Sequence, residues 1–288
     1  MHRAALLVLF LFSAVFSSQT RAIYEYRFAI DSTRKDSVVS ELMYLDISQK
    51  GSKFYSKQAH DSDSLAAAEV RKQIASKSSN IQIKRSGQSA VGFEVEKTSG
   101  KEVYLLTTVG RDYFRVKDER GISWTIHPET AVHEELKIQK ATTHFAGRDW
   151  TAWFSAEVPI SEGPYKFHGL PGLIVKLESK DQSHSFTLKG LRKSPGSSAD
   201  MSLPQGVEVP FFSRKAIEVD RMQYKKHLEQ YRRDPVQGMR EMLSQPNSKV
   251  VINVGGVEYS NPQDILRQME KSARAREKKR NNPIELEN

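Results

Sequence analysis

Residues 140–178 read KATTHFAGRDWTAWFSAEVPISEGPYKFHGLPGLIVKLE and decide the fold class of this chain. From Trp150 to Val158, apolar and polar side chains alternate, and Trp153 is the one large apolar side chain on the polar face. A second alternation covers Leu173–Leu177. Alternation with a period of two is typical of strands that bury one face, so these two segments predict neighbouring strands of an antiparallel sheet.

The connection between these two strands contains two Pro and Gly pairs. Leu170-Pro171-Gly172-Leu173 suits a type II turn, because Pro fixes φ at the second position and Gly accepts positive φ at the third. Leu170 and Leu173 would then pin the turn to the core. Gly163-Pro164 predicts a bend just before it.

Two interpretations of this connection stay open. In the first, it only folds the sheet, through Gly163, Pro164, Phe167, Gly169, Leu170, Pro171, Gly172, Leu173 and Ile174. In the second, it is a rigid loop in which Tyr165 and Phe167 point one way and Lys166 and His168 the other. The partner-binding residues would then be Arg148, Trp153, Tyr165, Lys166 and His168, since exposed aromatic and Arg side chains suit binding hot spots.

Short alternating segments extend outward from this region in both directions. The other expected strands cover Ile23–Ile30, Met43–Ile47, Val91–Val95, Val103–Val109, Tyr113–Val116, Ile122–Ile126, Leu136–Ile138 and Phe186–Leu188. One helix is expected over Ser64–Ala75, with Asp63 as its cap. The predicted fold is mainly β: an antiparallel curved sheet or half-open barrel with C-terminal helices, a β-rich α+β protein.

The composition changes after Leu191, and this change divides the chain. We expect an antiparallel β domain over 19–191, a linker or long loop over 192–210 and a C-terminal helical segment over 211–288 that packs on the sheet.

Within the C-terminal segment, the pattern predicts a helix over Arg214–Arg232, a short strand over Val250–Val254 and a last helix that begins at Asn261 and runs to Arg280. Residues Pro283–Leu286 are expected to finish the chain as an extended segment against the sheet, with Ile284 and Leu286 on one face. The basic end of the last helix is a solvated face or a contact for acidic lipid or polysaccharide.

Residues 1–18 have the pattern of a secretory signal peptide: a basic start, thirteen residues that are apolar except for Ser13, and small residues before a cleavage point. An uncleaved anchor is the alternative, although thirteen residues span only about 20 Å as a helix. No later segment approaches 18 consecutive apolar residues, so no transmembrane span is expected after cleavage. The expected location is exported: periplasmic, outer-membrane-associated or secreted. Export disfavours nucleic-acid partners.

The composition and the motifs exclude several kinds of chemistry. The 288 residues include no Cys, which rules out disulfides, thiolate zinc ligands and thiol catalysis. His133-Glu134-Glu135-Leu136-Lys137 begins like a zinc-protease helix but has Lys137 in place of the second His. There is no phosphate-binding P-loop and no nucleophile elbow. We therefore predict no catalytic residue, no metal ligand and no cofactor.

The segment Gly163–Ile174, GPYKFHGLPGLI, resembles the motif that names the GLPGLI family of exported Bacteroidetes proteins. Upstream residues Lys140-Ala141, Gly147-Arg148 and Trp150, and the ending Asn281–Leu286, are similar to the same family. The motif also suggests some similarity to the N-terminal domain of type II peptide-N-glycosidases. Many members carry a Cys before the Lys-Ala pair, whereas this chain has Gln139.

The resemblance implies export and β-rich architecture but no established reaction. The favoured function is a non-enzymatic binding or assembly module for an envelope protein, glycan or lipid. The alternatives are a hydrolase of envelope glycan or peptide, with a carboxylate such as Glu157 at its centre, and a purely structural protein.

Overall fold

The computed structural model describes residues 19–34, 36–76, 87, 89–194, 215–245, 250–254 and 256–286. The expected signal peptide over 1–18 and residues 195–210 of the expected linker lie outside the described residues.

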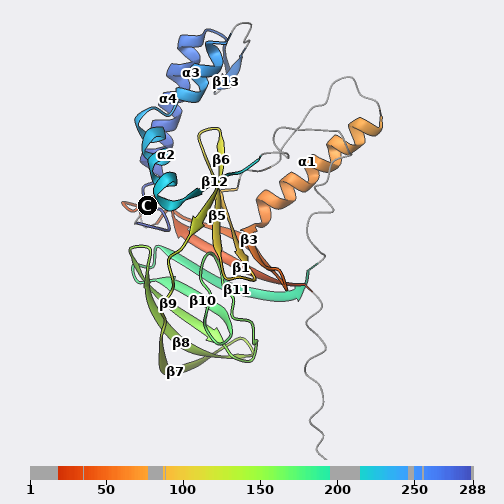
Figure 1. Cartoon of the computed structure of the whole chain (residues 1–288), viewed down its shortest axis with the longest axis vertical. Helices are drawn as coiled ribbons and strands as arrows, with labels where there is room; N and C mark the ends of the chain where they lie inside the picture. Colours follow the sequence, from red (N-terminus) through yellow and green to blue (C-terminus); the bar gives the residue numbers. More distant parts are fainter. Residues whose placement is uncertain are drawn as a thin grey trace, which may run out of the picture.

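A single large sheet forms the body of the molecule. Among the described residues, its twelve strands follow the order β12-β6-β5-β4-β3-β2-β1-β11-β10-β9-β8-β7, and it stays open, with β12 and β7 at its two edges. All neighbours are antiparallel except β12 and β6, which are parallel. Figure 1 shows the sheet curving so that β7–β10 lie at one end of the long axis of the molecule.

The strands have these bounds: β1 Thr20–Ala29, β2 Val38–Ser48, β3 Gly51–Ser56, β4 Phe93–Thr98, β5 Val103–Val109, β6 Asp112–Asp118, β7 Thr125–His133, β8 Leu136–Phe145, β9 Arg148–Ser155, β10 Leu173–Ser179, β11 His184–Lys193 and β12 Ile217–Asp220. A separate hairpin pairs β13 (Ile252–Val254) with β14 (Val257–Tyr259).

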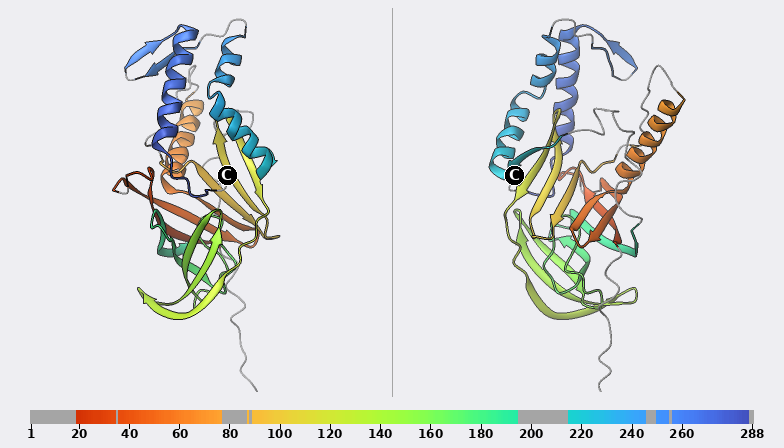
Figure 2. Two further views of the ribbon diagram at one scale, coloured as in Figure 1. Left: turned by 90° about the vertical axis from the view of Figure 1, so that its left-hand side faces the viewer. Right: turned by 45° about the vertical axis from the view of Figure 1, so that its right-hand side comes forward.

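In the part of the chain that the structure describes, four helices accompany the sheet: α1 Lys57–Ala75, α2 Arg221–Arg233, α3 Gln237–Leu243 and α4 Pro262–Lys279. Helices α2, α3 and α4, with the β13–β14 hairpin, project beyond the β5–β6 end of the sheet (Figure 2). From the end of α4 the chain returns to the body, so the C-terminus lies beside the sheet rather than at the tip of the helices (Figure 1). We call residues 281–286 the C-terminal tail.

The main hydrophobic core follows the concave sheet and the connection between β9 and β10. Trp150, Phe154, Phe167 and Phe186 are each at most 2% exposed within it. A small second cluster around Phe114 of β6 joins the sheet to α2 through Tyr224, Leu228 and Tyr231. The packing of the helices therefore depends on few apolar side chains, and α2 and α3 bury none completely.

The predicted fold class is confirmed: a mainly β, curved, open antiparallel sheet with C-terminal helices. Each expected strand overlaps an observed one, but β3, β12, β14 and α3 were not predicted. The helix expected over Arg214–Arg232 begins only at Arg221, because Ile217–Asp220 pair with β6 as β12. The first helix begins at Lys57 rather than near Ser64, since the Ser56 hydroxyl, rather than Asp63, accepts the capping bond from the Ala59 N–H.

Among the residues that the structure describes, no helix combines the length and the apolar character needed to span a bilayer.

Candidate functional site

The motif segment, residues 163–174, forms the second part of the connection between β9 and β10 and the first two residues of β10. It is packed into the core. The side chains of Tyr165, Lys166, Phe167 and Leu170 are at most 2% exposed. The expectation of a presented, alternating loop is therefore wrong, because Tyr165 takes a left-handed conformation (φ 55°) that lets three consecutive side chains point inward. Leu170 and Leu173 do pin the connection to the core, as predicted.

The turn in the motif is also tighter than the predicted type II turn. The Gly172 N–H donates to Leu170 O (2.8 Å) across Pro171, which is a three-residue turn. The Leu173 N–H is then free to donate to Val158 O (3.0 Å). A Cβ placed on Gly172 would lie 2.1 Å from Ser155 O, so the segment passes the end of β9 at a distance that only glycine permits.

Lys97 of β4 holds the start of the motif segment in place. Its buried ammonium donates to Gly163 O (2.9 Å) and Phe167 O (3.1 Å) and forms an ion pair with Glu162 (2.6 Å). A lysine at an inward strand position thus satisfies carbonyls of an irregular loop that no strand can pair.

A buried cluster of charges lies on the other side of the motif segment and includes the C-terminal tail. The Lys166 ammonium contacts both Asp118 (2.7 Å) and Glu285, and Arg120 bridges the same two carboxylates (2.6 and 2.7 Å). The Tyr165 hydroxyl donates to Glu285 (2.6 Å). Two cations therefore balance two carboxylates in a site from which water is largely excluded.

Electrostatics in this cluster favour the charged forms of its carboxylates. Burial by itself raises the pKa of Glu285, but the charges of Lys166 and Arg120 outweigh burial and lower it below its usual value. The same two cations lower the pKa of Asp118 against the effect of its burial. Burial, with Glu285 next to it, raises the pKa of Tyr165 well above its usual value. The cluster is thus built to stay ionised, which suits a fixed structural contact.

Arg148 holds the same tail from the first position of β9. Ala146 (φ 54°) and Gly147 (φ 78°) form the two-residue turn between β8 and β9, as in a type I′ hairpin, and Arg148 follows directly. Its buried guanidinium donates to the side chains of Asp181 (2.7 Å) and Asn282 (2.7 Å), and to Pro283 O and Ile284 O.

The five side chains predicted to bind a partner therefore lie in different environments. Arg148, Tyr165 and Lys166 all contact the C-terminal tail and are buried, so their expected exposure is wrong: this chain supplies its own partner segment. Trp153 lies half-buried in the middle of β9, opposite Lys140 and Lys176 of the neighbouring strands. His168 is half-buried, and its ring contacts Lys166 O (2.8 Å).

The Asp118, Arg120 and Glu285 side chains were not found by sequence reasoning. Glu285 lies between Ile284 and Leu286, and the expected alternation placed those two apolar side chains on one buried face. In the structure Glu285 is 2% exposed and Leu286 is 55% exposed, so the expected orientation is wrong. A carboxylate in an apolar context was the one available signal.

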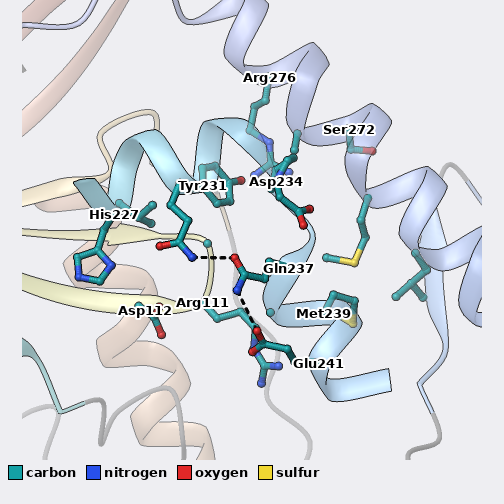
Figure 3. Close-up of a pocket in the computed structure, with 18 of the residues that line it drawn as sticks. Arg111, Asp112, His227, Tyr231, Asp234, Gln237, Met239, Glu241, Ser272 and Arg276 are labelled. Carbon is teal, nitrogen blue, oxygen red and sulfur yellow. Dashed lines mark hydrogen bonds between the residues drawn. The ribbon is translucent and has the colours of Figure 1, made fainter. Parts of the chain in front are cut away.

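A cleft of about 870 Å³ lies where the turn between β5 and β6 meets the helices (Figure 3). Residues from α2, α3, α4 and β13 complete its walls. The side chains labelled there are Arg111, Asp112, His227, Tyr231, Asp234, Gln237, Met239, Glu241, Ser272 and Arg276. Its size lies within the usual range for ligand sites, roughly 300–1,000 Å³.

Polar side chains along one wall of the cleft are held in a row. Gln230 donates to Gln237 (2.9 Å), and Gln237 donates to Glu241 (3.0 Å), as the dashed lines in Figure 3 show. Met239, Met269, Ile252 and Val254 also line the cleft and give it apolar surface. The wall offers amide and carboxylate groups beside flexible thioethers.

A second cavity, of about 530 Å³, lies over β1–β4 and the start of α1. The charged groups in it are largely paired with each other: Arg21 with Asp46 (2.6 Å), and Lys53 with Glu94 (2.7 Å). The cleft at the helices is the larger of the two, and we take it as the candidate functional site.

No curated protein matches the sequence. Two solved structures of PNGF-II, in space groups P21 and C2, are structurally similar at 12% sequence identity, each with a TM-score of 0.47. Each match covers 75% of this chain and 34% or 33% of that chain. This chain thus spans about one third of the length of the PNGF-II structures it matches.

A family model described as "Protein of unknown function (Porph_ging)" matches residues 16–176. The matched region contains β1 to β9, the start of β10 and the whole motif segment. Because the match covers more than half of the 288 residues, this protein belongs to the Porph_ging family of proteins of unknown function.

Proposed function

We propose that this protein is an exported, non-enzymatic binding module of the cell envelope and that its cleft takes a polypeptide segment of another envelope protein. The single observation that carries the proposal is the cleft itself, because it combines ligand-site size with both polar and apolar walls. The charged groups inside the body are instead used in structural contacts.

The residue types in the cleft favour a polypeptide over a glycan or a lipid. Tyr231, Met239, Met269, Arg111 and Arg276 belong to the aromatic, Met and Arg classes that are enriched at protein interfaces. Methionine side chains adapt to partners of different shape. Side-chain amides such as that of Gln237 can both donate to and accept from an extended backbone.

The experiment for the cleft uses the tagged full-length protein in its native host. Light crosslinking and isolation from the envelope should retain a specific polypeptide on the unmodified protein. The double variant Arg111→Ala/Met239→Ala should retain it at least tenfold less, as hot-spot truncations do. Leu65→Ala, which truncates a 64% exposed side chain on α1, is the matched control and should retain it fully.

An unchanged set of retained molecules in the double variant would refute the cleft as the binding site. A glycan or a lipid that is lost in place of a polypeptide would replace the proposed partner by that class.

Export is the second part of the proposal, and it rests on the pattern of residues 1–18. It is supported by the position of β1, which begins at Thr20, directly after the expected cleavage point. The GLPGLI assignment, which rests on the motif at Gly169–Ile174, implies the same. N-terminal sequencing of protein isolated from the native envelope should give a first residue of Ser18 or Gln19. A chain that still begins at Met1 would contradict cleavage.

A further inference from the structure

The C-terminal tail lies on a surface of the body that we call the tail cradle. The tail cradle consists of Ala29, Ile30, Asp118, Arg120, Ala146, Arg148, Tyr165 and Lys166. Two backbone bonds set the path of the tail: the Asn282 N–H donates to Ile30 O (3.2 Å), and the Leu286 N–H donates to Ala146 O (2.9 Å). The Asn282 amide also donates to Ala29 O (2.8 Å). The tail therefore bridges the end of β1 and the turn between β8 and β9.

The tail cradle contacts the side chains of the tail as well as its backbone. Arg148 pairs with the Asn282 side chain and with two tail carbonyls, and Ile284, 9% exposed, joins the main core. Pro283 between them lacks an N–H and holds φ near −65°, which favours the extended path. The tail thus offers an amide, a proline, an apolar side chain and a carboxylate in sequence.

The charge of the tail cradle requires an acidic tail. Without Glu285, the cradle contains Lys166 and Arg120 against the single carboxylate of Asp118, which is an uncompensated buried cation. Glu285 restores neutrality and accepts from the Tyr165 hydroxyl as well. Uncompensated charge in a buried site is strongly disfavoured, so the cradle selects a carboxylate at this position.

The arm that carries the tail is held loosely apart from the tail itself. In the described part of α4, Ile265 near the N-terminal end is the one fully buried side chain. Near the other end, Arg274 donates to backbone carbonyls of Arg232 and Arg233, and Arg232 pairs with Glu277, all at exposed positions. Arg280, which joins α4 to the tail, is exposed. Most of the buried contacts at this end of the chain are thus made by the tail.

We propose that the tail cradle is a peptide-recognition site whose partner is the C-terminal tail of a second copy of this chain, so that copies assemble by exchanging tails. A tail bound in the cradle of a second copy makes the same contacts as a tail bound in its own cradle, so exchange loses none of these contacts. The proposal is independent of the cleft, because none of the residues of the cradle lines it.

The test mixes two full-length variants. Glu285→Lys places a cation beside Lys166 and Arg120, and Lys166→Glu places a carboxylate beside Glu285, so neither variant can close its own cradle without like-charge repulsion. In an equimolar mixture each tail meets a cradle of opposite charge in the other chain. We expect a one-to-one heterodimer by light scattering after gel filtration, at concentrations where each variant alone is a monomer.

The double variant Glu285→Lys/Lys166→Glu is the matched control. It restores opposite charges within one chain and should be folded and monomeric when freshly diluted. Separate monomers in the mixture, with each variant folded by circular dichroism, would refute tail exchange.

A second measurement keeps the proposal testable if the charge reversals do not fold. A fluorescent synthetic peptide with the sequence of residues 281–288 should bind full-length Glu285→Gln at least tenfold more tightly than the unmodified protein, whose own tail competes at a high effective concentration. A peptide with Gln in place of Glu285 should bind at least tenfold more weakly. Equal binding of both peptides, or no binding to the variant, would overturn recognition by the cradle.

Discussion

His184 is an uncharged histidine enclosed by aromatic rings. Its ring is 1% exposed, lies parallel to those of Tyr26 and Phe28, and meets the Tyr26 hydroxyl at 2.8 Å through Nδ1. Burial, with the nearby positive charge of Arg148, lowers the pKa of His184 to about 3. The unfolded chain takes up this proton near pH 6.5, so it binds more protons than the folded chain between these two values.

The free energy of unfolding should therefore fall as the pH falls from about 6.5 toward 3. The contribution of His184 amounts to about 1.4 kcal/mol per pH unit within that window. His184→Gln keeps an acceptor for Tyr26 but does not titrate. Urea unfolding at pH 7, 6 and 5 should give a shallower pH dependence for this variant, and identical slopes would contradict a neutral His184.

Gly172 is required for its small volume at the end of the motif. Gly172→Ala would place a methyl group 2.1 Å from Ser155 O and 2.9 Å from Ala156 Cα, both backbone atoms that cannot turn aside. We expect a loss of about 1–3 kcal/mol of unfolding free energy. Gly92→Ala is the control, since nothing lies within 4 Å of its added Cβ, and it should change stability by less than about 1 kcal/mol. Chemical denaturation that finds the two variants equally stable would refute the steric argument.

At the scale of elements, α2 buries no side chain completely, and a side-chain cap stabilises its first turn. The Asp220 carboxylate accepts from the Gln223 N–H (2.8 Å), while the Gln223 side chain accepts from the Asp220 N–H (2.9 Å), which is a capping box. Asp220→Ala should cost about 1 kcal/mol of local helix stability, whereas Asp220→Asn should keep most of the cap. Amide hydrogen exchange in the first turn should speed up about fivefold in the alanine variant alone. Unchanged exchange would show that α2 is held by other contacts.

Helices and strands with clear caps or a clear periodicity of apolar residues were predictable from the sequence. Those that depend on pairing with another strand were not. The helix from Asn261 has its cap, its Pro262 and its acidic first turn in the sequence, and α4 begins there as predicted. Strand β3 was missed because Ser52, Lys53 and Ser56 give it a polar composition. Its last three residues are nevertheless buried. Strand β12 has four residues and exists through its parallel pairing with β6, which no local pattern reveals.

At the scale of the whole molecule, the buried charge cluster joins three distant parts of the chain. Lys166→Met leaves two buried carboxylates to Arg120 alone, and Glu285→Gln leaves one cation uncompensated. Each change should cost about 3 kcal/mol of unfolding free energy. The double variant should cost less than the sum by about 0.5–3 kcal/mol, because the two groups contact each other. Urea unfolding of all four proteins measures this coupling, and additive costs would contradict the pairing.

Sequence reasoning predicted the sheet but not this cluster, for a physical reason. Periodicity reports which face of a strand is buried, and it served well for β9 and β10. Asp118, Lys166 and Glu285 are separated by 48 and 119 residues along the chain, so only the folded topology brings them together. Lys166 was singled out, but as an exposed contact, since a buried lysine is recognisable only once its partners are known.

The attachment of α4 through the C-terminal tail also sets how the protein responds to mechanical load. A pull on the last residues reaches Glu285 and the bonds of Arg148 before it reaches α4, so the ion pairs and carbonyl bonds are loaded first. These contacts must break before the helices can be drawn from the sheet. The tail contacts therefore bear a force applied at the C-terminus first and protect the lightly packed helices from it.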